Sequence, residues 1–411
     1  MSDLAWIPEE LLSPDTGTVA LILLGAILAS SILADTIARR TAIPRISLLV
    51  MVGLAIAVIQ QLVLGQEGGR PLGDLAEPLI QLALVMVAFL LGGQLTLARL
   101  RQLGPLIVIL SLAVMGLGVL LVGGGLLLFG FPLVIAVTLA AISVATDPEA
   151  IEEVLEERRP HSRAARVLAG VVAIDDAWGI LAFGLAMAFL GWFLSGDGST
   201  ALLHAGWELL GAILLGAVVG LPAAWLTGRL EPGKPTQAEA LALVLLIAGL
   251  AMWLEVSALL AAMVAGVLVV NLSAHHTRSF NEIEHIEWPF LVFFLVLSGA
   301  SVDLAALDTV FWLIVAYVGL RLAGRYLGGM LGLRLAGERA RGLPHGIGLA
   351  LTPQTGVAIG MALLAAELFP EEGTVIVSTV VAATLVFELV GPWIVRRILP
   401  EDSSGAGEPR Q

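Results

Sequence analysis

Apolar stretches of about twenty residues recur along nearly the whole chain, and their length decides what the chain is able to fold into. Of the 411 residues, 58% are hydrophobic and only 13% are charged, whereas a soluble domain carries roughly a quarter charged residues. The stretches are long enough for helices that cross a bilayer, and they lack the alternation with period two that a membrane barrel requires. The sequence therefore predicts an all-α polytopic membrane protein.

The apolar windows predict about 13 transmembrane helices in two halves. Spans one to six, about 16–194, and spans eight to thirteen, about 236–397, form the halves, and a helix at about 201–228 links them. The division at Glu255 rests on a very short connection between two apolar stretches. The predicted spans are 16–38, 46–64, 76–97, 104–130, 132–155, 164–194, 201–228, 236–254, 256–273, 287–305, 309–335, 343–368 and 373–397.

Basic residues gather in every second loop of this arrangement. The opposite loops are mainly acidic, with Arg70 as their basic residue. By the positive-inside rule, the N-terminus lies outside and the C-terminus in the cytoplasm. We therefore expect a multi-pass protein of a prokaryotic inner (plasma) membrane, with one transmembrane domain over 1–398 and a short cytoplasmic tail at 399–411. The basic residues assigned to the cytoplasm are Arg39, Arg40, Arg45, Arg99, Arg101, Arg158, Arg159, Arg163, Arg166, Arg229, Lys234, Arg278, Arg334, Arg339, Arg341, Arg396 and Arg397.

The residue inventory excludes several kinds of chemistry. The chain has no cysteine, so a disulfide, a thiolate metal site and a cysteine nucleophile are excluded. Its six histidines show no spacing typical of metal ligands, and its net charge is −13. We expect no cofactor and no nucleic-acid partner; the expected surroundings are the lipid bilayer.

Asp175 and Asp176 stand side by side inside the apolar run 167–185. Ionised carboxylates are costly inside a membrane, so they are functional candidates by default. Such a pair suits cation binding, proton transfer or both; the alternative is a buried, hydrogen-bonded pair with a structural role. Adjacent helical residues point about 100° apart, so the two acids should not ligate one ion equally.

Prolines interrupt two of the predicted spans. The fifth contains Thr146-Asp147-Pro148 and the twelfth contains Thr352-Pro353, and each helix should break there because proline removes a backbone donor. The two spans run in opposite directions, which is the sequence pattern of a transporter with inverted repeats and crossed broken helices. Asp147 and Asp175 fall near the predicted midplane; Asp147 could also simply cap a half-helix.

The remaining charges expected to be buried in the membrane are Arg321, Arg325 and Glu388. The two arginines are four residues apart and share a helix face. Glu388 lies at a depth similar to that of Arg325, which predicts a structural ion pair between them. A second ion site or proton relay is the functional alternative.

These features together resemble the monovalent cation:proton antiporter superfamily. The break at Thr146-Asp147-Pro148 is similar to that of NhaP-type sodium/proton exchangers. Ile174-Asp175-Asp176 resembles the Asp-Asp signature of the NapA- and Kef-type branch. Segments 256–266, 293–299 and 351–360 also resemble parts of this superfamily.

The resemblance implies an NhaA-like antiporter fold, a homodimer and a role for each site residue. Asp176 would alternately bind the cation and the proton, and is therefore the expected ligand of the monovalent cation, with Asp175 as an accessory acid. The expected cation and proton site comprises Asp176, Asp175, Thr146, Asp147 and Ser143, faced by Thr352, Pro353 and Gln354 of the other broken helix.

We therefore expect a secondary transporter, not an enzyme, that exchanges sodium, or alternatively lithium or potassium, for protons and so serves pH homeostasis. The rivals are a Kef-like potassium channel, an intramembrane aspartyl protease and an organic-anion symporter of similar architecture. Two departures from the family pattern matter. The tenth span has no lysine, which favours exchange without net charge movement, and Val171 and Val172 stand where relatives often carry a glutamate.

Overall fold

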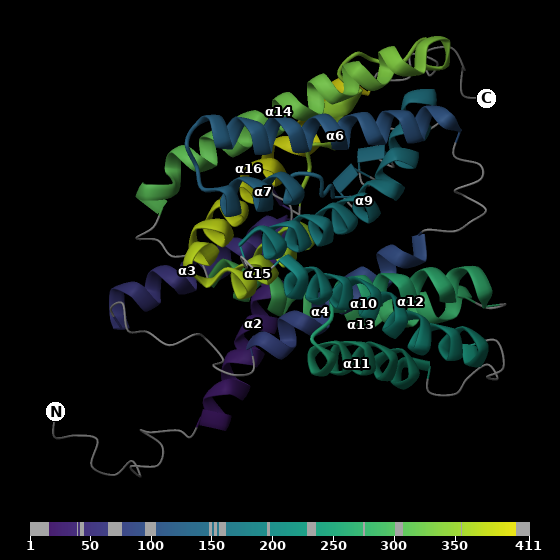
Figure 1. Cartoon of the computed structure of the whole chain (residues 1–411). Helices are drawn as coiled ribbons and strands as arrows, with labels where there is room; N and C mark the ends of the chain where they lie inside the picture. The colour runs from purple at the N-terminus through teal and green to yellow at the C-terminus, as the bar shows by residue number, and fades with distance from the viewer. Residues whose placement is uncertain are drawn as a thin grey trace, which may run out of the picture.

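A computed structural model of the chain describes thirteen ranges of residues, and their regular elements are helices (Figure 1). The described ranges are 16–38, 40–41, 45–64, 76–94, 104–147, 150–151, 154–155, 162–194, 198–227, 236–273, 276–300, 307–354 and 356–399.

The described helices follow one another along the whole chain. In chain order they are α2 (Thr16–Ala38), α3 (Arg45–Leu64), α4 (Ala76–Gln94), α6 (Pro105–Leu128), α7 (Leu133–Ile142), α9 (Arg163–Leu194), α10 (Gly198–Thr227), α11 (Thr236–Leu254), α12 (Ala258–Leu272), α13 (His276–Ala300), α14 (Leu307–Ala336), the 3-10 turns η3 (Gly337–Ala340) and η4 (Ile347–Leu351), α15 (Gly356–Leu368) and α16 (Pro370–Ile398).

Each predicted span overlaps an apolar helix, which confirms the all-helical membrane fold. Five stretches of the described residues are long and apolar enough to cross a membrane by length and composition, and shorter apolar helices accompany them. The tenth span differs most at its start, because α13 begins at His276 and not near 287. The exact number of spans and the orientation of the termini stay predictions.

The short connection at Glu255 does separate two helices. Glu255 adopts a left-handed φ of 54°, and the N–H of Val256 donates to the carbonyl of Ala251 at 3.0 Å. This arrangement ends α11 in the manner of a helix C-cap. Ser257 then caps α12, because its hydroxyl accepts a hydrogen bond from the N–H of Leu260 at 3.3 Å.

The helices form two packed groups, which we call the crossing bundle and the flanking panel. The crossing bundle contains α6, α7, α9, α14, η4, α15 and α16, and its helices α6 and α14 run side by side along one edge of the molecule (Figure 1). The flanking panel contains α2, α3, α4, α11, α12 and α13. Helix α10 packs on both α9 and α12, while α15 and α16 reach the panel through α4 and α3.

Glycines bring the panel helices into backbone contact. A Cβ atom at Gly53 of α3 would lie 2.1 Å from the carbonyl oxygen of Val296 in α13. A Cβ atom at Gly92 of α4 would lie 2.2 Å from the carbonyl oxygen of Met263 in α12. Small residues at such interfaces let membrane helices approach closely, so backbone van der Waals contact joins α3 to α13 and α4 to α12.

Candidate functional site

Two interrupted helices meet in the middle of the crossing bundle. Helix α7 ends at Ile142, and the chain then passes through a turn into an extended segment that reaches Asp147. The other interruption follows η4, where the chain is non-helical over Thr352, Pro353 and Gln354; helix α15 then begins at Gly356. The backbone N–H of Asp147 donates to the carbonyl of Pro353 at 2.9 Å, which joins the two breaks directly.

The second break lies where the sequence predicts it, whereas the first begins earlier than expected. The expected position was near Asp147-Pro148, but α7 already ends at Ile142; Pro148 lies outside the described residues. A continuing helix would bond the N–H of Asp147 to the carbonyl of Ser143. That N–H instead bonds to Pro353, and the Ser143 carbonyl receives two arginines.

Arg321 of α14 binds backbone carbonyls from both breaks. Its Nε donates to the carbonyl of Ser143 at 3.0 Å and its Nη2 to that of Ala145 at 2.7 Å. Its Nη1 donates to the carbonyl of Thr352 at 2.6 Å. The guanidinium also lies over the ring of Phe387, 4.3 Å from its centroid. One buried cation therefore satisfies the carbonyl ends that both interruptions expose.

Arg325, one helical turn later, joins the first break to an acid. Its Nη1 forms an ion pair with Asp175 at 2.9 Å, and its Nη2 donates to the carbonyl of Val144 at 2.6 Å and to the hydroxyl of Thr146 at 3.0 Å. The predicted partner was Glu388, which is buried on α16, and this assignment is corrected. Similar depth gives the height of a residue in the membrane but not the face of the helix it occupies.

Asp175 is completely buried, and both of its carboxylate oxygens accept hydrogen bonds. The hydroxyl of Ser111 on α6 donates to Oδ1 at 3.1 Å. The hydroxyl of Thr146 donates to Oδ2 at 2.7 Å, beside the contact with Arg325. A buried charge is tolerated when it is paired and hydrogen-bonded, and these partners meet that condition.

The other predicted site residues take different places around this centre. Asp176 continues helix α9 directly after Asp175, but its side chain lies outside the described residues. Asp147 is buried at the crossing. The hydroxyl of Ser143 turns back to the carbonyl of Ala140 at 2.6 Å, so this side chain is engaged within its own helix.

Gln354 places an amide beside the crossing. This fully buried side chain donates through Nε2 to the hydroxyl of Tyr317 at 3.3 Å and to the carbonyl of Ile142 at 3.4 Å. Its Oε1 atom has no hydrogen-bond partner among the described residues. The break at Thr352-Pro353 is packed by α16, since a Cβ atom at Gly391 would lie 2.8 Å from Cγ of Pro353.

Sequence reasoning missed Ser111 and Tyr317. Both lie in long apolar helices, α6 and α14, and both are fully buried. A lone hydroxyl in a membrane helix often bonds to its own backbone, as Ser298 does to Phe294 at 2.6 Å. The sequence therefore carried no signal that Ser111 reaches an acid on another helix.

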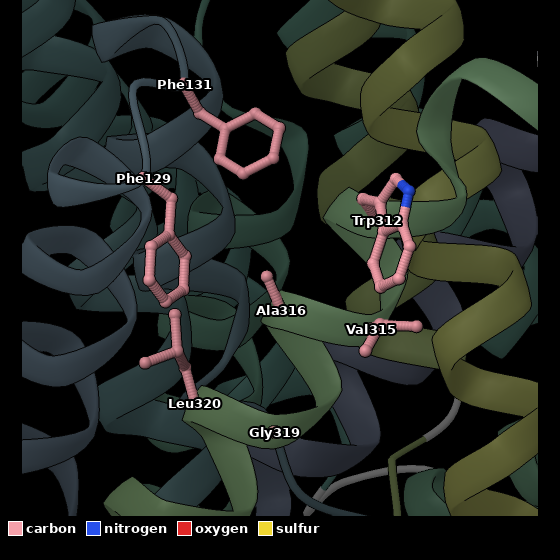
Figure 2. Close-up of a pocket in the computed structure, with 7 residues that line it drawn as sticks. All are labelled: Phe129, Phe131, Trp312, Val315, Ala316, Gly319 and Leu320. Atoms are coloured by element: carbon pink, nitrogen blue, oxygen red, sulfur yellow. The ribbon is translucent and has the colours of Figure 1, made fainter.

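A cavity of about 530 Å³ lies beside the N-terminal half of α14, and no acidic residue lines it (Figure 2). None of its lining residues carries a charge, so it does not suit a cation. Among the described side chains, no three His, Cys, Asp or Glu residues gather as a metal site. The residues lining the cavity are Phe129, Phe131, Trp312, Val315, Ala316, Gly319 and Leu320.

Comparison with known proteins gives a consistent result over nearly the whole chain. A family model described as the transmembrane sodium/hydrogen exchanger matches residues 18–399. A structure of the sodium proton antiporter MjNhaP1 from Methanocaldococcus jannaschii at pH 8 is similar in fold, with a TM-score of 0.71 and 19% identity, over 93% of this chain and 97% of that one. An electron-microscopy structure of MjNhaP1 gives a TM-score of 0.70 at 19% identity, over 96% and 99% of the two chains. No curated protein matches the sequence.

Proposed function

Because the chain belongs to the transmembrane sodium/hydrogen exchanger family, we propose that it exchanges sodium ions for protons across the membrane by competition at Asp176. A deprotonated Asp176 binds the cation, and protonation releases it. The chain then presents the site to the other side of the membrane by movement of the crossing bundle against the flanking panel.

The observation that carries this proposal is the engagement of Asp175. Its two oxygens are occupied by Ser111, Thr146 and Arg325. Protonating Asp175 would leave Arg325 buried without its counter-charge, which is costly. Asp176 is the next residue of the same helix, and adjacent helical residues point about 100° apart, so we take Asp176 as the acid left for exchange.

The positions of Arg321 and Arg325 support a cation site that does not use the carbonyls of the broken helices. They occupy the carbonyl ends of both broken helices, which in other inverted-repeat transporters are available to coordinate a cation. A sodium ion would be repelled from this side by two buried positive charges. We propose that the ion instead binds on the face of α9 that carries Asp176.

Helix packing supports the inverted repeat. If spans one to six match spans eight to thirteen, α3 corresponds to α12 and α4 to α13, so the pair α3–α13 should resemble the pair α12–α4. A Cβ atom at Gly299 would lie 2.3 Å from the carbonyl oxygen of Val50, and one at Gly266 would lie 2.2 Å from that of Phe89. Under this correspondence, the contact of Gly266 in α12 matches that of Gly53 in α3, and the contact of Gly299 in α13 matches that of Gly92 in α4. The repeat requires such matching pairs.

The remaining parts of the proposal concern assembly and setting. We propose a homodimer in a prokaryotic inner membrane, with the arginine-rich loops in the cytoplasm, as the positive-inside rule favours. Sodium is the proposed substrate, and lithium or potassium are the alternatives that a cation series would reveal.

The test is exchange in proteoliposomes with a pH indicator trapped inside. Addition of sodium outside an acid-loaded vesicle should move protons for the unmodified chain. Asp176→Asn should abolish this movement while thermal stability in detergent stays near that of the unmodified chain. Asp175→Asn should show the opposite pattern, with a clear loss of stability and residual exchange.

The reciprocal pattern makes the test decisive. Exchange at the unmodified rate in Asp176→Asn would exclude this residue as the carrier. Sodium flux that ignores an imposed pH gradient would favour a channel. Proton movement driven only by an organic anion would favour a symporter and contradict the proposed substrate.

A further inference from the structure

One contact between the crossing bundle and the flanking panel is made by Leu84 of α4, whose side chain packs against Gly360 of α15. Helix α15 packs on α4, and a Cβ atom at Gly360 would lie only 2.2 Å from Cδ2 of Leu84. Leu84 is 2% exposed and Gly360 is buried. Any larger residue at position 360 would displace the leucine, so the contact as seen depends on the absence of a side chain there.

The contact lies between the crossing and one surface of the membrane. Gly360 is one helical turn past Gly356, where α15 begins after the second break. Leu84 and Gly360 each lie roughly two turns, about 12 Å, from the ends of their helices that the charge distribution assigns to the outside. An ion that travels from the crossing to the outside between α15 and α4 would have to pass this point.

We propose that Leu84 on Gly360 is the outer closure of the ion pathway, formed in one access state and separated in the other. The inference rests on the proposed exchange function and names the contact that its conformational step must break. Leu84 belongs to the panel and Gly360 to the bundle, so movement of one group against the other slides α15 along α4. Because Gly360 has no side chain, the Leu84 side chain packs directly against the backbone of α15. It can also move off this position without passing a Cβ atom.

A second contact of the same kind supplies a matched control. A Cβ atom at Gly125 of α6 would lie 2.6 Å from Cδ2 of Leu320 in α14. Both of these helices belong to the crossing bundle and pack along their length. This contact should therefore persist in both access states.

The experiment uses cysteine pairs in a chain that has no cysteine of its own. Leu84→Cys with Gly360→Cys is reconstituted in proteoliposomes, oxidised with copper phenanthroline to a disulfide, and then reduced with dithiothreitol. Sodium-driven proton movement should fall by about tenfold or more on oxidation, which corresponds to trapping one state, and return on reduction. Oxidation of Gly125→Cys with Leu320→Cys should leave the exchange rate within about twofold.

Several results would overturn the closure. Full exchange by a pair shown by mass spectrometry to be cross-linked would do so, and so would an active pair that does not cross-link. If the unmodified chain itself shows no exchange, the proposed function fails, which is a different result from exchange that survives the cross-link.

A second variant covers the case in which the reduced cysteine pair is inactive. Gly360→Ala alone should slow exchange, because its new Cβ atom displaces Leu84 from this position. Combining it with Leu84→Ala should restore at least part of the rate by removing the colliding methyl groups. A double variant as slow as Gly360→Ala alone would overturn the proposal.

Discussion

The crossing bundle adds buried charge to the close glycine contacts that it shares with the flanking panel; in the bundle, for example, a Cβ atom at Gly324 of α14 would lie 2.9 Å from Cα of Gly118 in α6. In the bundle, two helices are interrupted, and Arg321 and Arg325 bind the carbonyls that the interruptions expose. In the panel, α3, α4, α12 and α13 approach through glycines until backbone meets backbone. Buried charge is thus placed where the helical hydrogen bonds are lost, while these uninterrupted helices meet through backbone contact.

This difference indicates what each group is able to do. At these panel contacts the glycine faces a backbone carbonyl of the neighbouring helix, so there is no flexible side-chain end that could move aside. The bundle has an apolar core as well, but its two breaks are joined by the Arg325–Asp175 ion pair and by arginine–carbonyl contacts, which place several buried polar groups in one spot. We expect substitutions in the bundle to act through lost charge partners and substitutions in the panel to act through steric collision.

The largest expected loss of stability is for Arg325→Ala. This change leaves Asp175 buried without its counter-charge, and breaking a buried pair by removing one partner typically costs about 3–5 kcal/mol. Thermal denaturation in detergent should show the loss. The double variant Arg325→Ala with Asp175→Ala should lose less than the sum of the single changes; strictly additive losses would show that the two side chains do not interact.

Ser111→Ala should have a smaller effect in the same group of helices. It removes one donor to a buried carboxylate, and a hydrogen bond to a charged group is worth about 1.5–3 kcal/mol. Ser31→Ala on α2 is the control, because its exposed hydroxyl bonds to the carbonyl of Leu28 in its own helix. Equal denaturation midpoints for the two variants would contradict the role given to Ser111.

Gly53→Ala tests the panel by adding a single methyl group. Its Cβ atom would lie 2.1 Å from the carbonyl oxygen of Val296, and overpacking of this kind costs about 1–3 kcal/mol. Gly116→Ala in α6 is the matched control, since no other helix of the described residues comes within 4 Å of its Cβ position. We expect the control to unfold at or slightly above the temperature of the unmodified chain. If both variants unfold alike, the panel is looser than the structure shows.

The helices and the second break could be predicted from sequence because they depend on local properties. Apolar length gives α2 and α11 with both ends as expected, and the break at Thr352-Pro353 follows from the missing donor of proline. The early end of α7 could not be predicted, since it depends on carbonyl contacts with arginines far away in the chain.

The central ion pair illustrates the limit of sequence reasoning at the site. Arg325 and Asp175 are 150 residues apart, and Asp175 was expected to be an accessory acid without a named partner. Depth in the membrane offered Glu388 as the counter-charge, but the choice between two buried acids depends on how α14 is rotated against α9. That rotation is set by side-chain packing, and the pattern of apolar residues along either helix does not predict it.

Exchange under an imposed voltage tests most directly the claim that Asp175 is held by Arg325 while Asp176 alone exchanges. One proton for one sodium ion moves no net charge. The rate of sodium-driven proton movement in proteoliposomes should then be the same at zero potential and at a potential set by potassium and valinomycin. A rate that changes with the potential, or a sustained current that follows turnover, would mean that a second proton moves and would contradict the account.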